Sequence, residues 1–229
     1  MSFNDYNMLA EGYSASNEGN AWNAYYERPA VLRMLGDVTN EDVLDVGCGS
    51  GMHASALLQR GARVAGVDSS RGMLDIASAR LGPDVPLHCM SIEQPLPFAD
   101  GSFDAILASL VMHYLEDWAP SLNEFRRVLR DTGRLVISTH HPFMDHTQAQ
   151  GESYLETYSY TEEWGETGRP VVMRFWHRPL SAMVAALVKA GFTIGGLEEP
   201  LPDPSVRESD PRAWRLLTTQ PRFLFFLVR

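Results

Sequence analysis

The strongest chemical signal in the sequence is the segment VLDVGCGSG, Val43 to Gly51, in which an apolar strand leads directly into a glycine-rich turn and then a helix. Glycine lets the backbone approach a ligand closely, and the N-terminus of the following helix offers free N–H groups to a carboxylate or a phosphate. The spacing of Gly47, Gly49 and Gly51 lacks the third glycine of the G-x-G-x-x-G dinucleotide fingerprint. The segment therefore predicts a nucleotide-derived ligand and disfavours a nicotinamide-dependent dehydrogenase.

Two aspartates accompany this turn. Asp68 ends the second predicted strand, where a carboxylate can accept hydrogen bonds from ribose hydroxyls. Asp45 lies inside the first motif, where it suits a ligand with an ammonium group better than one with a pyrophosphate. Together they predict a ligand that contains an adenosine.

Histidines supply candidate bases. His140 and His141 directly follow the fifth predicted strand, at the carboxyl end of the sheet, where open α/β folds bind their ligands. A neutral imidazole there could remove a proton from a hydroxyl or an ammonium group. Adjacent side chains on an extended chain point in opposite directions, so at most one of the two faces the pocket and the other bonds to neighbouring loops. His113 is a third candidate, and it could equally bond only to backbone.

A metal site is not expected. His140, His141, Asp145 and His146 are metal-ligand types, but their spacing matches no standard site. The two remaining candidates near the motifs, His53 and His88, are interpreted as surface or helix-terminus residues.

Aromatic residues gather in two further segments. Residues 1–40 contain several tyrosines, tryptophans and amides, and residues 141–177 contain Tyr154, Tyr158, Trp164 and Trp176. Pockets combine apolar walls with a few polar groups, so these rings could line a binding site for a second ligand. They could equally form an amphipathic helix on the sheet and a small core of the inserted segment.

The elements that must position these residues alternate in the pattern of a doubly wound α/β fold. Apolar runs predict seven strands, at 43–46, 63–67, 87–90, 103–109, 134–139, 192–197 and 223–228. Helical spacing predicts helices that contain Ala54 to Leu58 and that span 72–81, 121–129 and 179–190, and residues 200–221 are expected to form a loop. Residues 140–177 break the alternation without a clean helical period, and long irregular segments in compact domains are usually functional.

The whole chain of 229 residues fits one domain. We expect a helical lid at 1–40, a ligand-binding core at 41–140, a substrate cap at 141–177, and a C-terminal helix with the closing strands at 178–229. A formal net charge of −10 disfavours nucleic acid as a partner and favours a small molecule. Two cysteines without a secretory signal predict reduced thiols and a cytoplasmic protein, and no apolar run is long enough for a membrane span.

Four motifs in order resemble the class I S-adenosylmethionine-dependent methyltransferases, of the small-molecule (methyltransferase type 11-like) kind. They are VLDVGCGSG, VAGVDSSRGML, PLPFADGSFDAILASLVMHYLEDW and EFRRVLRDTGRLVIS, and they cover roughly residues 40 to 140. The resemblance implies a Rossmann-like, mostly parallel sheet with helices on both faces, with the cap inserted after the fifth strand. It also implies S-adenosylmethionine as cofactor and S-adenosylhomocysteine as product.

The resemblance also implies where the cofactor lies. Ser91 stands where the family usually has an aspartate near the adenine amino group, so that contact is made more weakly or by Glu93. The residues implied for the cofactor are Asp45, Gly47, Cys48, Gly49, Gly51, Asp68, Ser69, Met73, Ser91, Ile92, Glu93 and Ser109. Those considered for the methyl acceptor are Tyr13, Tyr25, Tyr154, Trp164 and Trp176, with Arg28 a further candidate for the acceptor or for the methionine carboxylate.

In such an enzyme the cofactor already carries an activated methyl group, so the protein must align the nucleophile and exclude water. The expected reaction is methyl transfer to an O, N or C atom of a small metabolite. The alternative is a cofactor-binding partner or sensor protein without activity, which would have no room beside the sulfonium. Neither the acceptor nor the choice between monomer and homodimer follows from the sequence.

Overall fold

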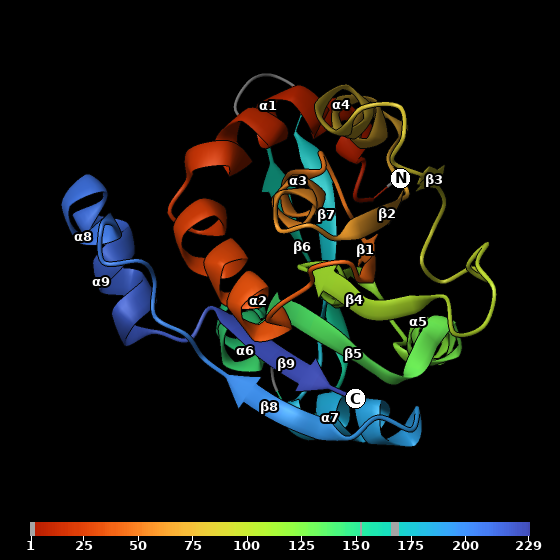
Figure 1. Ribbon diagram of the computed structural model, residues 1–229. Coiled ribbons are helices and arrows are strands. Elements are labelled where there is room, and N and C mark those ends of the chain that lie inside the picture. Colours follow the sequence, from red (N-terminus) through yellow and green to blue (C-terminus); the bar gives the residue numbers. More distant parts are fainter. Residues whose placement is uncertain (1–2, 152, 166–169) are drawn as a thin grey trace.

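The computed structural model describes residues 3–151, 153–165 and 170–229. These residues form a seven-stranded sheet in the order β3-β2-β1-β4-β5-β9-β8 and a separate two-stranded sheet, β6-β7 (Figure 1). The first five strands in sequence are parallel, and β9 pairs antiparallel with both β5 and β8. The predicted doubly wound fold is confirmed.

The strands are β1 (Asp42–Val46), β2 (Arg63–Asp68), β3 (Leu87–Cys89), β4 (Phe103–Ser109), β5 (Leu129–His140), β6 (Tyr158–Trp164), β7 (Val171–His177), β8 (Ile194–Glu198) and β9 (Phe223–Val228). The helices are α1 (Tyr6–Gly19), α2 (Arg28–Leu35), α3 (Met52–Gln59), α4 (Arg71–Leu81), α5 (Ala119–Val128), α6 (Pro142–Ala149), α7 (Leu180–Lys189), α8 (Val206–Ser209) and α9 (Pro211–Thr219). A π-helical turn, η1 (Asn23–Glu27), precedes α2, and a 3-10 turn, η2 (Met112–Tyr114), follows β4.

Helices cover both faces of the large sheet because its central strands are apolar on both sides. Alternate residues such as Leu44 and Ile106 pack with α5 and α7 on one face. Their neighbours Val43 and Leu107 pack with α2, α3 and α9 on the other face. Burial on both faces is the reason why these parallel strands appear as continuous apolar runs.

Three predictions about local structure were wrong. The supposed loop at 200–221 contains α8 and α9, which lie at the side of the molecule (blue in Figure 1). The supposedly irregular segment after β5 contains α6 and the β6-β7 hairpin, in which more buried and less buried residues alternate along each strand. The strand predicted to begin at residue 134 begins at Leu129, and a register shift between Phe103 and Ala105 absorbs the extra residues of β5. Short helices and bulges give weak periodic signals, which explains these errors.

The N-terminal segment reaches the hairpin and α4. The Asn4 backbone N–H donates to Val172 O at 3.1 Å, and Arg174 N donates to Asn4 Oδ1 at 2.7 Å. In α1, Asn7 Oδ1 accepts from Ser70 Oγ and from Gly72 N. These bonds place α1 beside α4 (Figure 1), over the carboxyl ends of the parallel strands. In the described part of the chain, no helix is long and apolar enough to span a membrane.

Candidate functional site

A cavity of about 500 Å³ lies at the carboxyl ends of β1, β2 and β4, within the range of small-ligand sites. The N-terminal segment and β7 form its outer wall. From the core it is lined by Gly47, Cys48, Gly49, Ser50, Met52, His53, Asp68, Ser69, Met73, Met90, Ser91, Ile92, Glu93, Ser109, Leu110, Val111, Tyr114 and Leu115. From the outer wall it is lined by Phe3, Asn4, Tyr6, Tyr13, Asn17, Asn23, Glu27 and Arg174.

The glycine turn after β1 is held against its neighbours. The N–H groups of Gly47 and Cys48 donate to Val67 O at 2.8 and 3.0 Å. Gly47 has φ +69°, and a Cβ on it would lie 2.6 Å from Cγ2 of Val111. Only glycine fits there, because the turn needs a left-handed conformation and touches the loop after β4.

Asp68 lies at the end of β2 and faces this turn. Its Oδ2 accepts from Gly49 N and its Oδ1 from Ser70 N, both at 2.8 Å. Burial raises the pKa of this carboxyl, although the backbone N–H groups oppose the shift. A carboxylate oxygen can accept more than one hydrogen bond, so Asp68 can hold the turn and bind ligand hydroxyls together.

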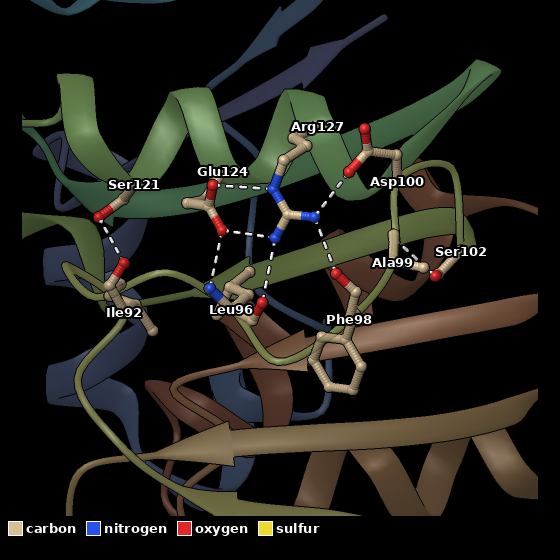
Figure 2. Close-up of polar contacts among 9 residues, drawn as sticks. All are labelled: Ile92, Leu96, Phe98, Ala99, Asp100, Ser102, Ser121, Glu124 and Arg127. Atoms are coloured by element: carbon tan, nitrogen blue, oxygen red, sulfur yellow. Dashed lines mark hydrogen bonds and ion pairs between the residues drawn. The ribbon is translucent and has the colours of Figure 1, made fainter.

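The loop after β3 supplies Ser91, Ile92 and Glu93 to the cavity, and α5 holds this loop from outside (Figure 2). Ser121 Oγ donates to Ile92 O at 3.0 Å. Figure 2 shows the Arg127 guanidinium at the centre of the network, where it donates to the carbonyl oxygens of Leu96 and Phe98 at 3.0 and 2.8 Å.

The same guanidinium also binds carboxylates, Glu124 at 2.6 and 2.9 Å and Asp100 at 2.9 Å. Glu124 in turn accepts from Leu96 N at 2.7 Å. The planar guanidinium thus binds Leu96, Phe98 and Asp100 together and fixes the path of a loop that has no regular secondary structure.

Two residues assigned to the cofactor by resemblance do not line the cavity. Asp45 is fully buried below it, and neither carboxylate oxygen has a hydrogen-bond partner among the described residues. Burial raises the pKa of Asp45 to about 6. Gly51 has φ +78° and packs against Ala77 and Leu81, so its role is to bring α3 close to α4.

The sequence did not reveal the pair that Glu27 forms with His53. Glu27 ends η1 and is fully buried, and its Oε2 lies 2.9 Å from His53 Nε2 on α3. Its Oε1 accepts from Ser109 Oγ at 2.7 Å and Ser138 Oγ at 2.6 Å, from facing positions on β4 and β5. His53 was interpreted as a surface or helix-terminus residue; it does lie in the first turn of α3, but its side chain is only 12% exposed.

In the folded protein the pKa of Glu27 is lower than its usual value and the pKa of His53 is higher than its usual value. Burial opposes charge on the Glu27 carboxyl, yet the His53 imidazole and the hydrogen bonds hold its pKa below the usual value. Burial also opposes charge on His53, yet Glu27 raises the pKa of the imidazole. Both shifts favour the charged form of the group concerned. No local signal in the sequence pointed to Glu27, because it lies in a helical run of aromatic residues; π-helical turns do often mark functional sites.

Aromatic rings form the outer wall. The hydroxyl oxygens of Tyr6 and Tyr114 are 2.5 Å apart, and Tyr13 packs edge to face on Tyr6. The Arg174 guanidinium lies 4.3 Å from the centre of the Phe3 ring. The wall therefore combines apolar surface, hydroxyls and one cation.

Of the five acceptor candidates, only Tyr13 lines the cavity. Trp164 lies behind Tyr13 and stacks on it at 6.2 Å. Tyr154 packs inside the inserted segment, 5.5 Å from the His177 ring, and its hydroxyl accepts from Leu180 N. Tyr25 is exposed, and Trp176 lies on β7 but does not line the cavity.

The three proposed histidine bases lie outside the cavity lining. His113 and His140 stack on each other at 3.7 Å, and His140 Nδ1 is 3.0 Å from Asp145 Oδ1. His141 caps α6 by accepting from Phe143 N and pairs with Glu199 at 3.0 Å. As expected, the two adjacent histidines diverge, but neither reaches the cavity because α6 and β7 cover the end of β5.

The Arg28 guanidinium also lies outside the cavity lining, where it donates to the backbone of Asn17 at 2.9 Å. Both cysteines are free thiols. Cys48 lines the cavity, and burial raises its pKa strongly, so it stays a protonated thiol.

The strand order, the glycine turn after β1 and the carboxylate after β2 define the class of α/β methyltransferases with a Rossmann-like sheet. Residues 44–137 match the family described as "Methyltransferase domain". The structure resembles an S-adenosylmethionine-dependent methyltransferase from Mesorhizobium loti, with 26% identity over 93% of this chain and 99% of that one and a TM-score of 0.72.

A putative S-adenosylmethionine-dependent methyltransferase from Listeria monocytogenes gives a TM-score of 0.74 at 24% identity, over 88% of this chain and 96% of that one. A demethylmenaquinone methyltransferase from Tropheryma whipplei is 35% identical over 58% of this chain, and the match spans 56% of that relative's length. Residues 44–137 therefore form a methyltransferase domain, and the similarity to an S-adenosylmethionine-dependent methyltransferase extends over 93% of the chain.

Proposed function

We propose that the protein transfers a methyl group from S-adenosylmethionine to an O, N or C atom of a small metabolite. The observation that carries this proposal is that a single cavity joins the glycine turn and Asp68 to a wall of aromatic residues. One end suits the methyl donor and the other offers space for an acceptor. A cofactor-binding protein without activity would need no such second compartment.

The residues present fit the cofactor. Asp68 would accept hydrogen bonds from the ribose hydroxyls, and the loop of Ser91, Ile92 and Glu93 would surround the adenine. The turn from Gly47 to Gly49 would border the methionine portion. The buried carboxylate of Asp45, which has no hydrogen-bond partner in the part of the chain that the structure describes, lies in the strand that precedes this turn. The bound cofactor supplies an electrophilic methyl group on a sulfonium, which needs no further activation.

The acceptor end is formed by Tyr6, Tyr13 and Tyr114, with Arg174 at the rim. Rings of this kind hold an apolar or aromatic body, while the hydroxyls and the guanidinium orient polar substituents. The similarity to the demethylmenaquinone methyltransferase of Tropheryma whipplei supports a small-molecule acceptor. The net charge of −10 also favours a small molecule over nucleic acid.

The contribution of the chain to catalysis is alignment and exclusion of water. Residues 1–40 act as a lid and residues 141–177 as a cap. Their described parts meet through hydrogen bonds that the backbone and side chain of Asn4 form with the backbone of β7. Holding the nucleophile in line can contribute roughly 7–11 kcal/mol. His113, His140 and His141 lie outside the cavity lining, whereas His53 lines it. If the methyl acceptor must lose a proton, the His53 imidazole can therefore act as the general base.

Isothermal titration with S-adenosylmethionine and with S-adenosylhomocysteine tests the donor half of the proposal. We expect binding by the wild type and its loss in Asp68→Ala, while Asp104→Ala, which removes a carboxylate at the far end of the sheet, retains it. Release of S-adenosylhomocysteine with candidate acceptors then tests turnover. A folded protein that binds neither ligand would refute the proposal, and binding without turnover of any acceptor would favour the sensor alternative.

A further inference from the structure

Glu27 and His53 form a close pair in the wall of the proposed donor site, and the shifts in their pKa values favour the charged form of each group. Glu27 is fully buried, and its two oxygens bind His53 Nε2, Ser109 Oγ and Ser138 Oγ at 2.6 to 2.9 Å. Both members line the same cavity as Asp68 and the glycine turn. Four elements, η1, α3, β4 and β5, thus converge on one carboxylate.

The surroundings of this pair carry an excess of negative charge. The charges of Glu27 and Asp45 act on His53, and those of Glu27 and Asp68 act on Asp45. Arg28 is the other cation that acts on His53, and its guanidinium is directed to the backbone of Asn17. Tyr13, which faces Glu27 and Asp68, stays protonated because burial raises its pKa. His53 is therefore the group that balances Glu27 in the free protein.

We propose that Glu27 is the counter-ion for the positive charge of the methyl donor, and that His53 gives up its proton to solvent when that charge enters the cavity. No covalent bond to carbon changes in this step. One cation replaces another beside the carboxylate, and the proton leaves to the buffer. The inference rests on the proposed function, since it assumes that this cavity binds the donor.

Charge explains why such a device would be useful. The donor carries a sulfonium that the thioether product lacks, so a buried carboxylate binds the donor more tightly than the product. The exchange also leaves a neutral imidazole in the cavity wall once the donor is bound. Among the described residues, His53 Nδ1 has no hydrogen-bond partner, so it can then accept a proton from an acceptor.

Calorimetry measures the exchange without an acceptor. S-adenosylmethionine is titrated near neutral pH in two buffers with different ionisation enthalpies, and the difference in binding enthalpy gives the protons released. We expect the wild type to release a substantial fraction of a proton, and His53→Gln to release much less. S-adenosylhomocysteine, which keeps the ammonium and lacks the sulfonium charge, is expected to release fewer protons than the donor.

The matched variant is Glu27→Gln, in which the amide oxygen can still accept from both serines and the amide nitrogen can donate to neutral His53. We expect it to weaken donor binding by about tenfold or more, and product binding less. Glu198→Gln removes the same charge from an exposed pair with Arg33 and is expected to change neither. If Glu27→Gln does not fold, Glu27→Asp with its shorter reach replaces it, with the same expected direction.

Histidine resonances in ¹⁵N-labelled protein provide a direct check, with His53 assigned by its absence in His53→Gln. Addition of the donor is expected to lower the titration midpoint of His53. Donor binding without proton release, or with equal release in His53→Gln, would overturn the inference and leave the proposed function intact. Absence of donor binding would overturn both.

Discussion

The hydroxyl oxygens of Tyr6 and Tyr114 lie 2.5 Å apart, and this contact joins the first helix of the chain to the turn that follows β4. It closes one side of the cavity with two rings that also pack edge to face at 6.0 Å. Burial raises the pKa of both hydroxyls, so the bond persists between two neutral phenols across the physiological pH range.

A double-mutant cycle measures this contact. Tyr6→Phe leaves the buried Tyr114 hydroxyl without its partner, so we expect a loss of about 1–3 kcal/mol in the free energy of unfolding, and a similar loss for Tyr114→Phe. The double variant should lose less than the two single losses added together, because no hydroxyl remains unpaired. Urea denaturation gives the three values. Strict additivity would mean that the two hydroxyls do not interact.

The glycine turn provides a matched pair of substitutions. Gly47 and Gly49 both have positive φ, but only a Cβ at Gly47 meets a neighbour within 4 Å, Val111. We expect Gly49→Ala to cost about 1–2 kcal/mol for the left-handed conformation alone. Gly47→Ala should cost about 1–3 kcal/mol more, because Val111 must move. Urea denaturation of both variants tests this order, and equal losses would contradict the close approach.

Arg127 holds the loop that carries Ser91, Ile92 and Glu93. Arg127→Met keeps the length of the side chain but removes its hydrogen bonds to Leu96 and Phe98, so we expect a loss of about 1–3 kcal/mol in stability. Affinity for S-adenosylmethionine should also fall, because the loop that we propose surrounds the adenine loses its support.

Arg126→Met is the control for this variant, since the neighbouring arginine lies outside the network shown in Figure 2. Thermal melts with and without the cofactor separate the two effects. A variant as stable as the wild type, with unchanged affinity, would show that the loop holds its shape without the guanidinium.

His113 makes stability depend on pH. Burial, together with the His140 charge, lowers the pKa of His113 well below 6.5 in the folded protein. The unfolded chain takes up this proton at a higher pH than the folded one does. The contribution of neutral His113 to the free energy of unfolding is therefore fully present above the pKa of His113 in the unfolded chain. It is lost as the pH falls through about 6.5 toward the pKa of His113 in the folded protein.

His113→Asn should remove this contribution, so that its free energy of unfolding falls less than that of the wild type between about pH 7.5 and 5.5. His53, whose raised pKa gives the opposite slope, is present in both proteins and cancels in the comparison. Denaturation curves at several pH values provide the test. Parallel pH profiles would show that His113 titrates normally.

Much of the lining of the proposed donor site could be predicted from the sequence, because these residues lie in short motifs at the ends of neighbouring strands. Gly47, Cys48 and Gly49 belong to a single strand–turn–helix motif, and Asp68 ends the next strand, so backbone geometry alone brings them to one edge of a parallel sheet. The same logic of adjacent strand ends brings Ser109 to the cavity lining. The limits of β4 and β9 were also predicted to the residue, since their apolar runs are unbroken.

The remainder depended on contacts between distant segments. Glu27 reaches the cavity because η1 packs over the ends of β4 and β5, where Ser109 and Ser138 bind it. His140 follows a strand end as a base should, but α6 and β7 cover it and direct it to Asp145 and His113. A strand end fixes where a backbone stops, and the elements packed above it decide whether its side chain meets the ligand. The sequence by itself therefore determined the fold and the donor motif, while the tertiary structure alone decided which charged groups face the cavity.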